Sequence, residues 1–201
     1  MTIGQHLYKK WWAYVLVLVL IVTLWALVYR TLDKPQDNEK LGITFIGKDF
    51  APARLQQQLY DCMPSRSQQP IKKYSVESVV FSNDLSFANM FATRLISKDM
   101  IIVQQSQLPE DVIVGTFEPL PMEKLSPYLP QDAQFYQKDG VVYGIELTGS
   151  NNNFADFYSG EEKCYVFLIR NSLNMGGIFG KGNTSDDMAL KVVQYLLEEK
   201  I

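Results

Sequence analysis

The stretch "DGVVYGIEL", Asp139–Leu147, predicts a tight turn that leads into a β-strand. Asp-Gly is a pair favoured where two successive residues take positive φ, as in a two-residue hairpin turn. The residues that follow are mainly β-branched or aromatic, and such side chains are enriched in strands. A glycine inside the strand, Gly144, indicates a bulge or a close approach of backbone. We therefore expect a strand of the main sheet here, with Tyr143 at least partly buried.

Toward the amino terminus, apolar strands alternate with helical patterns. The expected elements are a strand at Ile43–Ile46, a helix at Pro52–Met63, a strand at Tyr74–Phe81, a helix at Ser86–Ser97 and a strand at Met100–Gln105. This alternation is typical of parallel strands joined by right-handed crossovers. We expect one α/β domain of three layers with a mainly parallel sheet.

Toward the carboxyl terminus, we expect a strand at Cys164–Ile169 and an amphipathic helix at Ser185–Glu199. Between them, four glycines lie within Gly176–Gly182 and suggest a phosphate-binding loop. Such a loop ends in Gly-Lys-Ser or Gly-Lys-Thr, whereas Lys181 is followed by Gly182 and Asn183. The pattern favours an ordinary glycine-rich loop.

Near the amino terminus, Trp11–Tyr29 contains no charged residue. As a helix it would be roughly 28 Å long, close to the thickness of a bilayer's hydrocarbon core. Trp and Tyr lie at both of its ends, as in transmembrane helices. A buried helix of a soluble protein is one alternative. A cleaved signal peptide is another, but the run exceeds the usual apolar length and no small-x-small site follows.

The expected organisation is a short cytoplasmic segment at 1–10, a transmembrane signal anchor at 11–29, a polar linker at 30–40 and an extracytoplasmic domain at 41–201. The local charges do not select this orientation, because Lys9 and Lys10 precede the span while Arg30, Lys34 and Lys40 follow it. Long domains cross membranes largely regardless of such charges. The orientation also depends on a resemblance given below.

The charge and the titratable residues exclude several classes of function. Residues 1–40 hold five of the 19 basic and three of the 22 acidic residues, which leaves 14 basic and 19 acidic residues in 41–201, a net charge of −5. An acidic domain without a basic stripe argues against nucleic-acid binding. The single histidine, His6, precedes the anchor, and the aspartates have no metal-ligand spacing. We expect no enzyme activity, no cofactor and no metal.

The polar residues that follow the strands give a candidate binding site. Ligands of open parallel sheets bind beyond the carboxyl ends of the strands. The candidate residues at these ends are an aromatic side chain, an acid and three amides, namely Phe50, Asp84, Asn83, Gln104 and Gln105. Such a set suits a sugar or a small peptide. The alternative is that strand ends are polar because loops contact water.

Cys62 and Cys164 are the two cysteines of the chain. Outside the cytoplasm a disulfide between them is chemically allowed. The alternative is two separately buried thiols, because sequence alone cannot establish the Cα separation of roughly 4.4–6.8 Å that a disulfide needs.

From Leu41 onward the chain resembles one lobe of the type 2 periplasmic-binding fold, the fold of solute-binding proteins of bacterial carbohydrate importers. The resemblance rests on "ITFIG" (43–47), "DMIIV" (99–103), "FEPLP" (117–121) and "FYQKDGVVYGIEL" (135–147). In that family the Asp-Gly turn and the Tyr-Gly-Ile strand precede a strand that enters the second lobe, and "KCYVFLIRNSLNMGG" (163–177) is similar to that strand. The 38 residues from Cys164 to Ile201 are fewer than the roughly 100 of a further small domain.

The resemblance therefore implies a single lobe on a membrane anchor. It implies a single-pass, non-enzymatic binding or interaction module outside the cytoplasm. The partners that it implies are transporter membrane subunits, another envelope protein or a small solute such as a sugar. A structural or assembly protein of the cell envelope without a ligand is the alternative, and an enzyme is disfavoured because the sequence offers no catalytic set.

Overall fold

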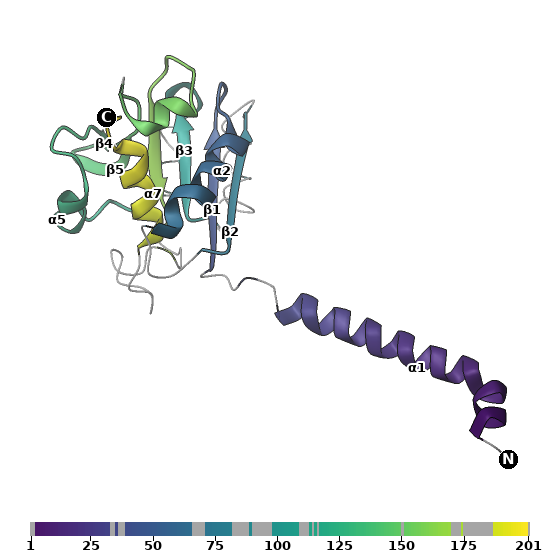
Figure 1. The fold of residues 1–201 in the computed structure, drawn as a ribbon. Helices are drawn as coiled ribbons and strands as arrows, with labels where there is room; N and C mark the ends of the chain where they lie inside the picture. The colour runs from purple at the N-terminus through teal and green to yellow at the C-terminus, as the bar shows by residue number, and fades with distance from the viewer. Residues whose placement is uncertain are drawn as a thin grey trace. The chain divides into compact units, whose positions relative to one another are not determined.

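The computed structural model describes residues 3–32, 35, 39–65, 71–81, 89, 98–108, 113, 115, 117–149, 151–169, 174 and 187–200. The chain divides into two compact units, Met1–Gln36 and Asp37–Ile201 (Figure 1). The first unit holds one long helix and the second holds an α/β domain.

The amino-terminal unit is the helix α1, Ile3–Leu32. Its stretch Lys10–Tyr29 is the one helical segment in the described part of the chain that is long and apolar enough to cross a membrane. None of that stretch is buried against protein. Twenty helical residues rise about 30 Å, which matches the hydrocarbon core of a bilayer. The expected apolar span at 11–29 is thus a continuous helix, and this length and composition suit an anchor.

The α/β domain contains six strands and three α-helices among the described residues. They are β1 (Lys40–Ile46), α2 (Pro52–Cys62), β2 (Lys73–Val79), β3 (Met100–Gln104), α5 (Met122–Leu125), β4 (Phe135–Lys138), β5 (Val141–Glu146), β6 (Cys164–Leu168) and α7 (Met188–Leu197). Short 3-10 helices lie between these elements: η2 (Met63–Ser65), η4 (Gln105–Gln107), η5 (Ser126–Tyr128) and η6 (Asn153–Asp156). The helix expected at Ser86–Ser97 lies outside the described residues except for Asn89. Of the residues 170–186, Asn174 alone is described.

All six strands form one sheet in the order β2-β1-β3-β6-β5-β4. The first three strands pair in parallel, as predicted from the alternating pattern. The expectation of a mainly parallel sheet is wrong, because β6 is antiparallel to both β3 and β5, and β5 is antiparallel to β4. The physical reason lies in the connections. The two-residue turn between β4 and β5 can join only antiparallel strands, whereas parallel pairs need a long crossover. Between β5 and β6 the described residues contain the short η6 and no crossover helix, so β6 returns antiparallel beside β5.

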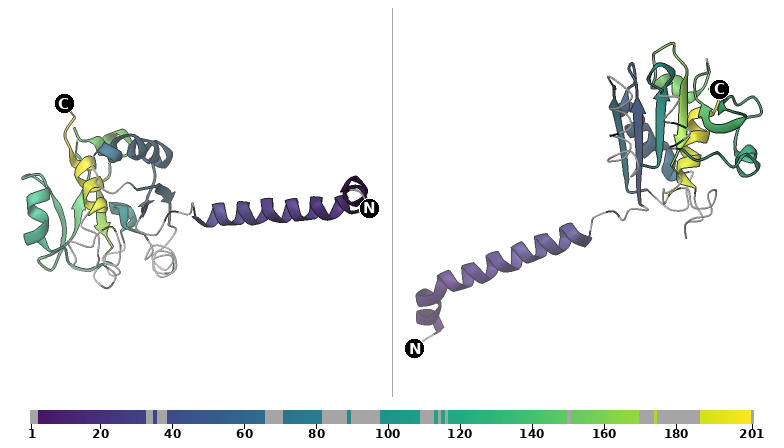
Figure 2. Two further views of the ribbon diagram at one scale, coloured as in Figure 1. Left: turned by 60° about the horizontal axis from the view of Figure 1, so that its bottom comes forward. Right: turned by 180° about the vertical axis from the view of Figure 1, so that it is seen from behind.

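The sheet has an apolar cluster on each face. Alternate residues such as Phe45, Ile102 and Val166 pack with the buried faces of α2 and α7, which lie on the same face of the sheet (Figure 2). On the other face, a second cluster contains Ile101 and Phe167 and includes Ile113 and Phe117. The central strands are covered on both faces, and for this reason their sequences are apolar without alternation. The strands β3 and β6 are accordingly buried at every position.

The stretch Asp139–Leu147 forms the turn and the second strand of the β4–β5 hairpin. Asp139 and Gly140 have φ of 52° and 76°, the values required by a two-residue turn. The pairing shifts register between Tyr136 and Gln137, so β5 carries a bulge. Tyr143 is 7% exposed, and a Cβ placed on Gly144 would lie 3.0 Å from Cε1 of Phe167. The predictions of a sheet strand, a buried Tyr143 and a glycine at a bulge or close approach are confirmed.

A buried polar cluster joins the amino ends of β1 and β3. The Oδ2 atom of Asp99 accepts a hydrogen bond from the Gly42 N–H at 2.6 Å. The Nδ2 group of Asn174 donates to Oδ1 of Asp99 at 2.9 Å and to the Lys40 carbonyl at 2.7 Å. The hydrogen bonds satisfy a carboxylate that is only 8% exposed. They also attach residue 174 to the first strand.

Candidate functional site

The carboxyl ends of β1, β3 and β5 meet at one edge of the sheet. Ile46 pairs with Val103, Val103 with Tyr165, and Tyr165 with Glu146. Because β5 and β3 are each antiparallel to β6, they run in the same direction and end at the same level. The residues after α7 also reach this edge, since Asn152 bridges to Glu199. We call it the carboxyl edge.

Gln104 lies at the carboxyl edge, as expected, but its side chain is used by the fold. It is 5% exposed, its Nε2 donates to the Tyr158 hydroxyl at 2.8 Å, and its Oε1 accepts from the Lys48 N–H at 3.0 Å. Gln105 is exposed and begins η4. Of the other predicted residues, Asn83 and Asp84 lie outside the described residues.

Phe50 lies at the same edge and is half-buried. Its ring stacks on Phe45 with centroids 4.2 Å apart. It lines an open hollow of about 510 Å³ together with Asp49, Arg54, Asp156, Tyr158 and Ser159. The structure therefore places one predicted residue at a hollow and one, Gln104, behind it, where it hydrogen-bonds the tyrosine of the hollow wall.

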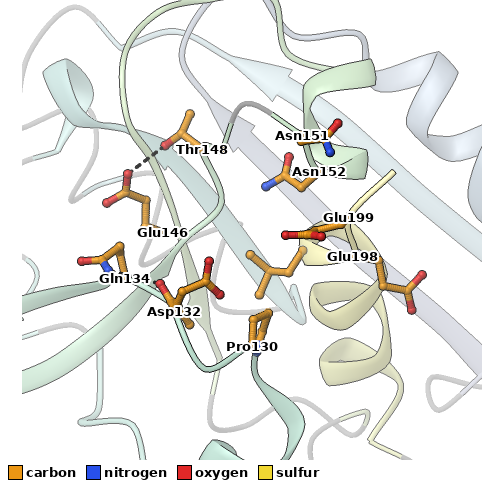
Figure 3. Close-up of a pocket in the computed structure, with 12 residues that line it drawn as sticks. Pro130, Asp132, Gln134, Glu146, Thr148, Asn151, Asn152, Glu198 and Glu199 are labelled. Atoms are coloured by element: carbon orange, nitrogen blue, oxygen red, sulfur yellow. Dashed lines mark hydrogen bonds between the residues drawn. The ribbon is translucent and has the colours of Figure 1, made fainter. Parts of the chain in front are cut away.

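A second hollow of about 410 Å³ lies at the same edge, between the end of β5 and the end of α7. We call it the acidic hollow. Its walls carry four carboxylates, from Asp132, Glu146, Glu198 and Glu199, and three amides, from Gln134, Asn151 and Asn152. Thr148, Gly149, Pro130, Ala133 and Leu197 complete the lining. Figure 3 shows the labelled side chains around the hollow. The volume lies within the range of ligand pockets, roughly 300–1,000 Å³.

Two side chains of the acidic hollow are held by hydrogen bonds. Glu146 is 10% exposed; it pairs with Nζ of Lys163 at 3.0 Å and accepts from the Thr148 hydroxyl at 3.4 Å (Figure 3). Asn152 donates from Nδ2 to the Leu147 carbonyl at 2.7 Å, and its Oδ1 accepts from the Ala155 N–H at 3.3 Å. Because their partners fix them, these groups need little reorganisation to meet a ligand.

The electrostatic character of the acidic hollow is negative. Glu198 and Glu199 follow the last residue of α7, where the helix dipole also places partial negative charge. Lys163 balances the charge of Glu146, and the hydrogen bond that its Nζ donates to Glu146 raises the pKa of Lys163. The hollow therefore favours neutral or cationic ligands over anions. Across the described residues, no three His, Cys, Asp or Glu side chains lie close enough together to hold a metal ion.

The disulfide between Cys62 and Cys164 is not formed, and both residues are free thiols. Cys62 ends α2, and the hydroxyl of neighbouring Tyr60 accepts from the Tyr74 N–H at the start of β2. Cys164 pairs with Gln104 at the opposite end of β3. Along the strands, the level of Tyr74 and the level of Cys164 are six residues apart. At 3.3 Å per residue this is about 20 Å, far beyond the reach of a disulfide.

The sequence analysis missed the acidic hollow because its walls come from irregular segments around β4, β5 and α7. A signal was present in the polar stretch "SNNNF" (150–154) and in the paired glutamates at 198–199. Neither segment shows by itself that the other lies opposite.

Comparisons with protein-family models, with curated protein sequences and with solved structures find no match.

Proposed function

We propose that this protein is a membrane-anchored, non-enzymatic binding module that takes a small polar solute in the acidic hollow. In this proposal α1 is a single-pass anchor, and the α/β domain lies outside the cytoplasm, as in half of a carbohydrate solute-binding protein. The observation that carries the proposal is a hollow of about 410 Å³ at the carboxyl edge, with side chains already fixed by hydrogen bonds.

The lining supports binding more than catalysis. The carboxylates of the acidic hollow suit hydrogen-bond acceptance from hydroxyl or ammonium groups, and the amides can donate and accept. General acid–base or nucleophilic chemistry would need a base, an acid or a nucleophile placed against one another. Glu146 instead has its charge balanced by Lys163 at 3.0 Å. Sugars and small amines are therefore the ligand classes that we propose.

The rival function, an assembly protein without a ligand, needs a surface for a protein partner. In the described part of the domain, the large hydrophobic side chains that are exposed are Tyr60, Val80 and Tyr128. Tyr60 lies on α2, Val80 directly follows β2 and Tyr128 lies on η5, so these side chains come from three separate segments. A large apolar patch is the usual mark of such an interface. The solute-binding proposal is accordingly preferred.

Thermal unfolding of the full-length protein in detergent tests the proposal. The probes are neutral sugars, small amines and polyamines, and small carboxylates and phosphates as anionic controls. A ligand at 100 times its Kd stabilises the folded state by about 2.7 kcal/mol, which raises the Tm by several degrees. We expect at least one neutral or cationic probe to raise the Tm and no anion to do so.

Two variants locate the effect. Glu199→Gln removes one exposed carboxylate of the acidic hollow and should weaken the stabilisation. Asp61→Asn changes an exposed acid on α2, away from the hollow, and should leave it unchanged. A panel that gives no shift at all argues against solute binding. A probe that is chemically converted during incubation would show that the module is an enzyme.

The orientation has its own test. Protease is added to cells whose outer layer is permeable and whose inner membrane is intact. An external domain should be digested, whereas one in the cytoplasm would be degraded only after lysis. The second result would reverse the topology and leave the binding proposal to be judged by the thermal experiment.

A further inference from the structure

The helix α1 is broken near its amino end. Lys10 has φ of −123° and ψ of 17°, far from the helical values near −63° and −42°. The residues on both sides are helical, so the chain forms a short helical segment, a bend and then the long helix. Figures 1 and 2 show the first turns leaving the axis of the long helix.

The bend coincides with the start of the apolar span. The stretch that can cross a membrane runs from Lys10 to Tyr29. When its 20 residues fill the hydrocarbon core, Lys10 lies at the level of the lipid headgroups. A straight helix would carry the preceding residues into water, whereas a bend at this level turns them along the bilayer surface. This step rests on the membrane anchor of the proposed function.

The sequence at the bend has the chemistry of an interface. Lys9 and Lys10 are adjacent, and the first acidic residue of the chain is Asp33, beyond the other end of the span. Trp11 and Trp12 follow directly and are 63% and 61% exposed. Indole rings are enriched at headgroup level, and lysines near a bilayer surface attract anionic lipids.

We propose that the segment from Ile3 to Trp12 is an interfacial element that binds the headgroups of anionic phospholipids through Lys9 and Lys10. Two lysines near an anionic surface together favour binding to anionic lipids by roughly thirtyfold. The bend keeps both charges among the headgroups, and the two tryptophans hold the depth of the segment. The anchor thus selects the lipids around it on this side of the membrane.

Tryptophan quenching by brominated lipids tests the proposal on the full chain. The background variant is Trp25→Phe, which leaves Trp11 and Trp12 as the only tryptophans. It is reconstituted into phosphatidylcholine vesicles that contain one tenth brominated phosphatidylglycerol or one tenth brominated phosphatidylcholine. We expect the anionic quencher to act severalfold more strongly, with the difference falling at high salt.

Replacing both lysines, Lys9→Gln with Lys10→Gln, should abolish the difference between the two quenchers. The control Lys48→Gln removes an exposed lysine of the domain and should preserve it. Equal quenching by both lipids in the background variant, or an unchanged preference in the double lysine variant, overturns the proposal. Absence of quenching by either lipid would overturn the anchor itself and the headgroup site with it.

Discussion

The central strands β1, β3 and β6 differ in burial and in use from the β4–β5 hairpin. Among the central strands, β3 and β6 are buried along their whole length and β1 is buried at five of its seven positions. In the hairpin, β4 has no fully buried residue and β5 has three. The acidic hollow borders the end of β5, in the hairpin. The central strands thus supply the core, and the less buried hairpin can carry polar side chains.

Large-to-small substitutions should show this difference most strongly. Phe45 on β1 is fully buried and stacks on Phe50, so Phe45→Ala should lower the free energy of unfolding by about 3–5 kcal/mol. Phe135 on β4 is only partly buried, and Phe135→Ala should cost about 1 kcal/mol. Chemical denaturation followed by tyrosine fluorescence measures both. Equal costs would break the distinction between the central strands and the hairpin.

The bulge of β5 is a tightly packed place in the otherwise less buried hairpin. Gly144→Val should cost about 1–3 kcal/mol, because the added atoms meet the ring of Phe167, only 3.0 Å from the Cβ position. Gly140→Ala in the hairpin turn is the matched control: a Cβ there meets nothing within 4 Å, but φ is +76°. Its cost should be the backbone strain alone, about 1 kcal/mol. If thermal melts show a larger loss of stability for Gly140→Ala than for Gly144→Val, the close-approach explanation is wrong.

Two neighbouring glutamines at the end of β3 sharpen the boundary between fold and site. Gln104→Ala leaves the Tyr158 hydroxyl and the Lys48 N–H without their partner and should cost about 2 kcal/mol. Gln105→Ala removes an exposed side chain, and its backbone N–H still donates to the Lys163 carbonyl, so stability should change by less than about 0.5 kcal/mol. If Gln104→Ala is as stable as the wild type, Gln104 is again a candidate binding residue.

The smallest expected effect is a loss of stability at high pH, from groups at the carboxyl edge. Burial raises the pKa of the Cys164 thiol from 9.0 to about 12 and that of Tyr158 from 10.0 to about 12. Above pH 9 the unfolded thiol loses its proton while the folded thiol keeps it, so stability falls as the pH rises from 9 toward 12. Between pH 8 and 10 we expect a loss of about 1–2 kcal/mol.

Melting curves of the wild type and of Cys164→Ala, recorded at pH 8 and pH 10, isolate the contribution of the thiol. The variant should lose less stability over this interval than the wild type does. The comparison uses the change with pH and not the absolute stability, because removing a buried side chain has its own cost. An identical pH dependence would show that Cys164 ionises alike in both states.

The sequence predicted the local elements better than it predicted their pairing. The turn at Asp139–Gly140 and the parallel strands were predictable because Asp-Gly and alternating patterns have direct physical causes. The direction of β6 was not, because "CYVFL" is apolar throughout, and a buried strand has that composition in either direction. Likewise, the position of Gln104 followed from the strand end, but its hydrogen bonds to Tyr158 and Lys48 depend on tertiary contacts.

The position of β6 determines when the sheet can be completed. The parallel strands β1, β2 and β3 are encoded by residue 104 and the hairpin by residue 146, yet these two parts are neighbours of β6 and not of each other. During synthesis both must therefore wait, each with an open strand edge, until Leu168 has left the ribosome. Open edges of this kind are sites of aggregation in incomplete chains. The last central strand, β6, thus sets how long both open edges are exposed during synthesis.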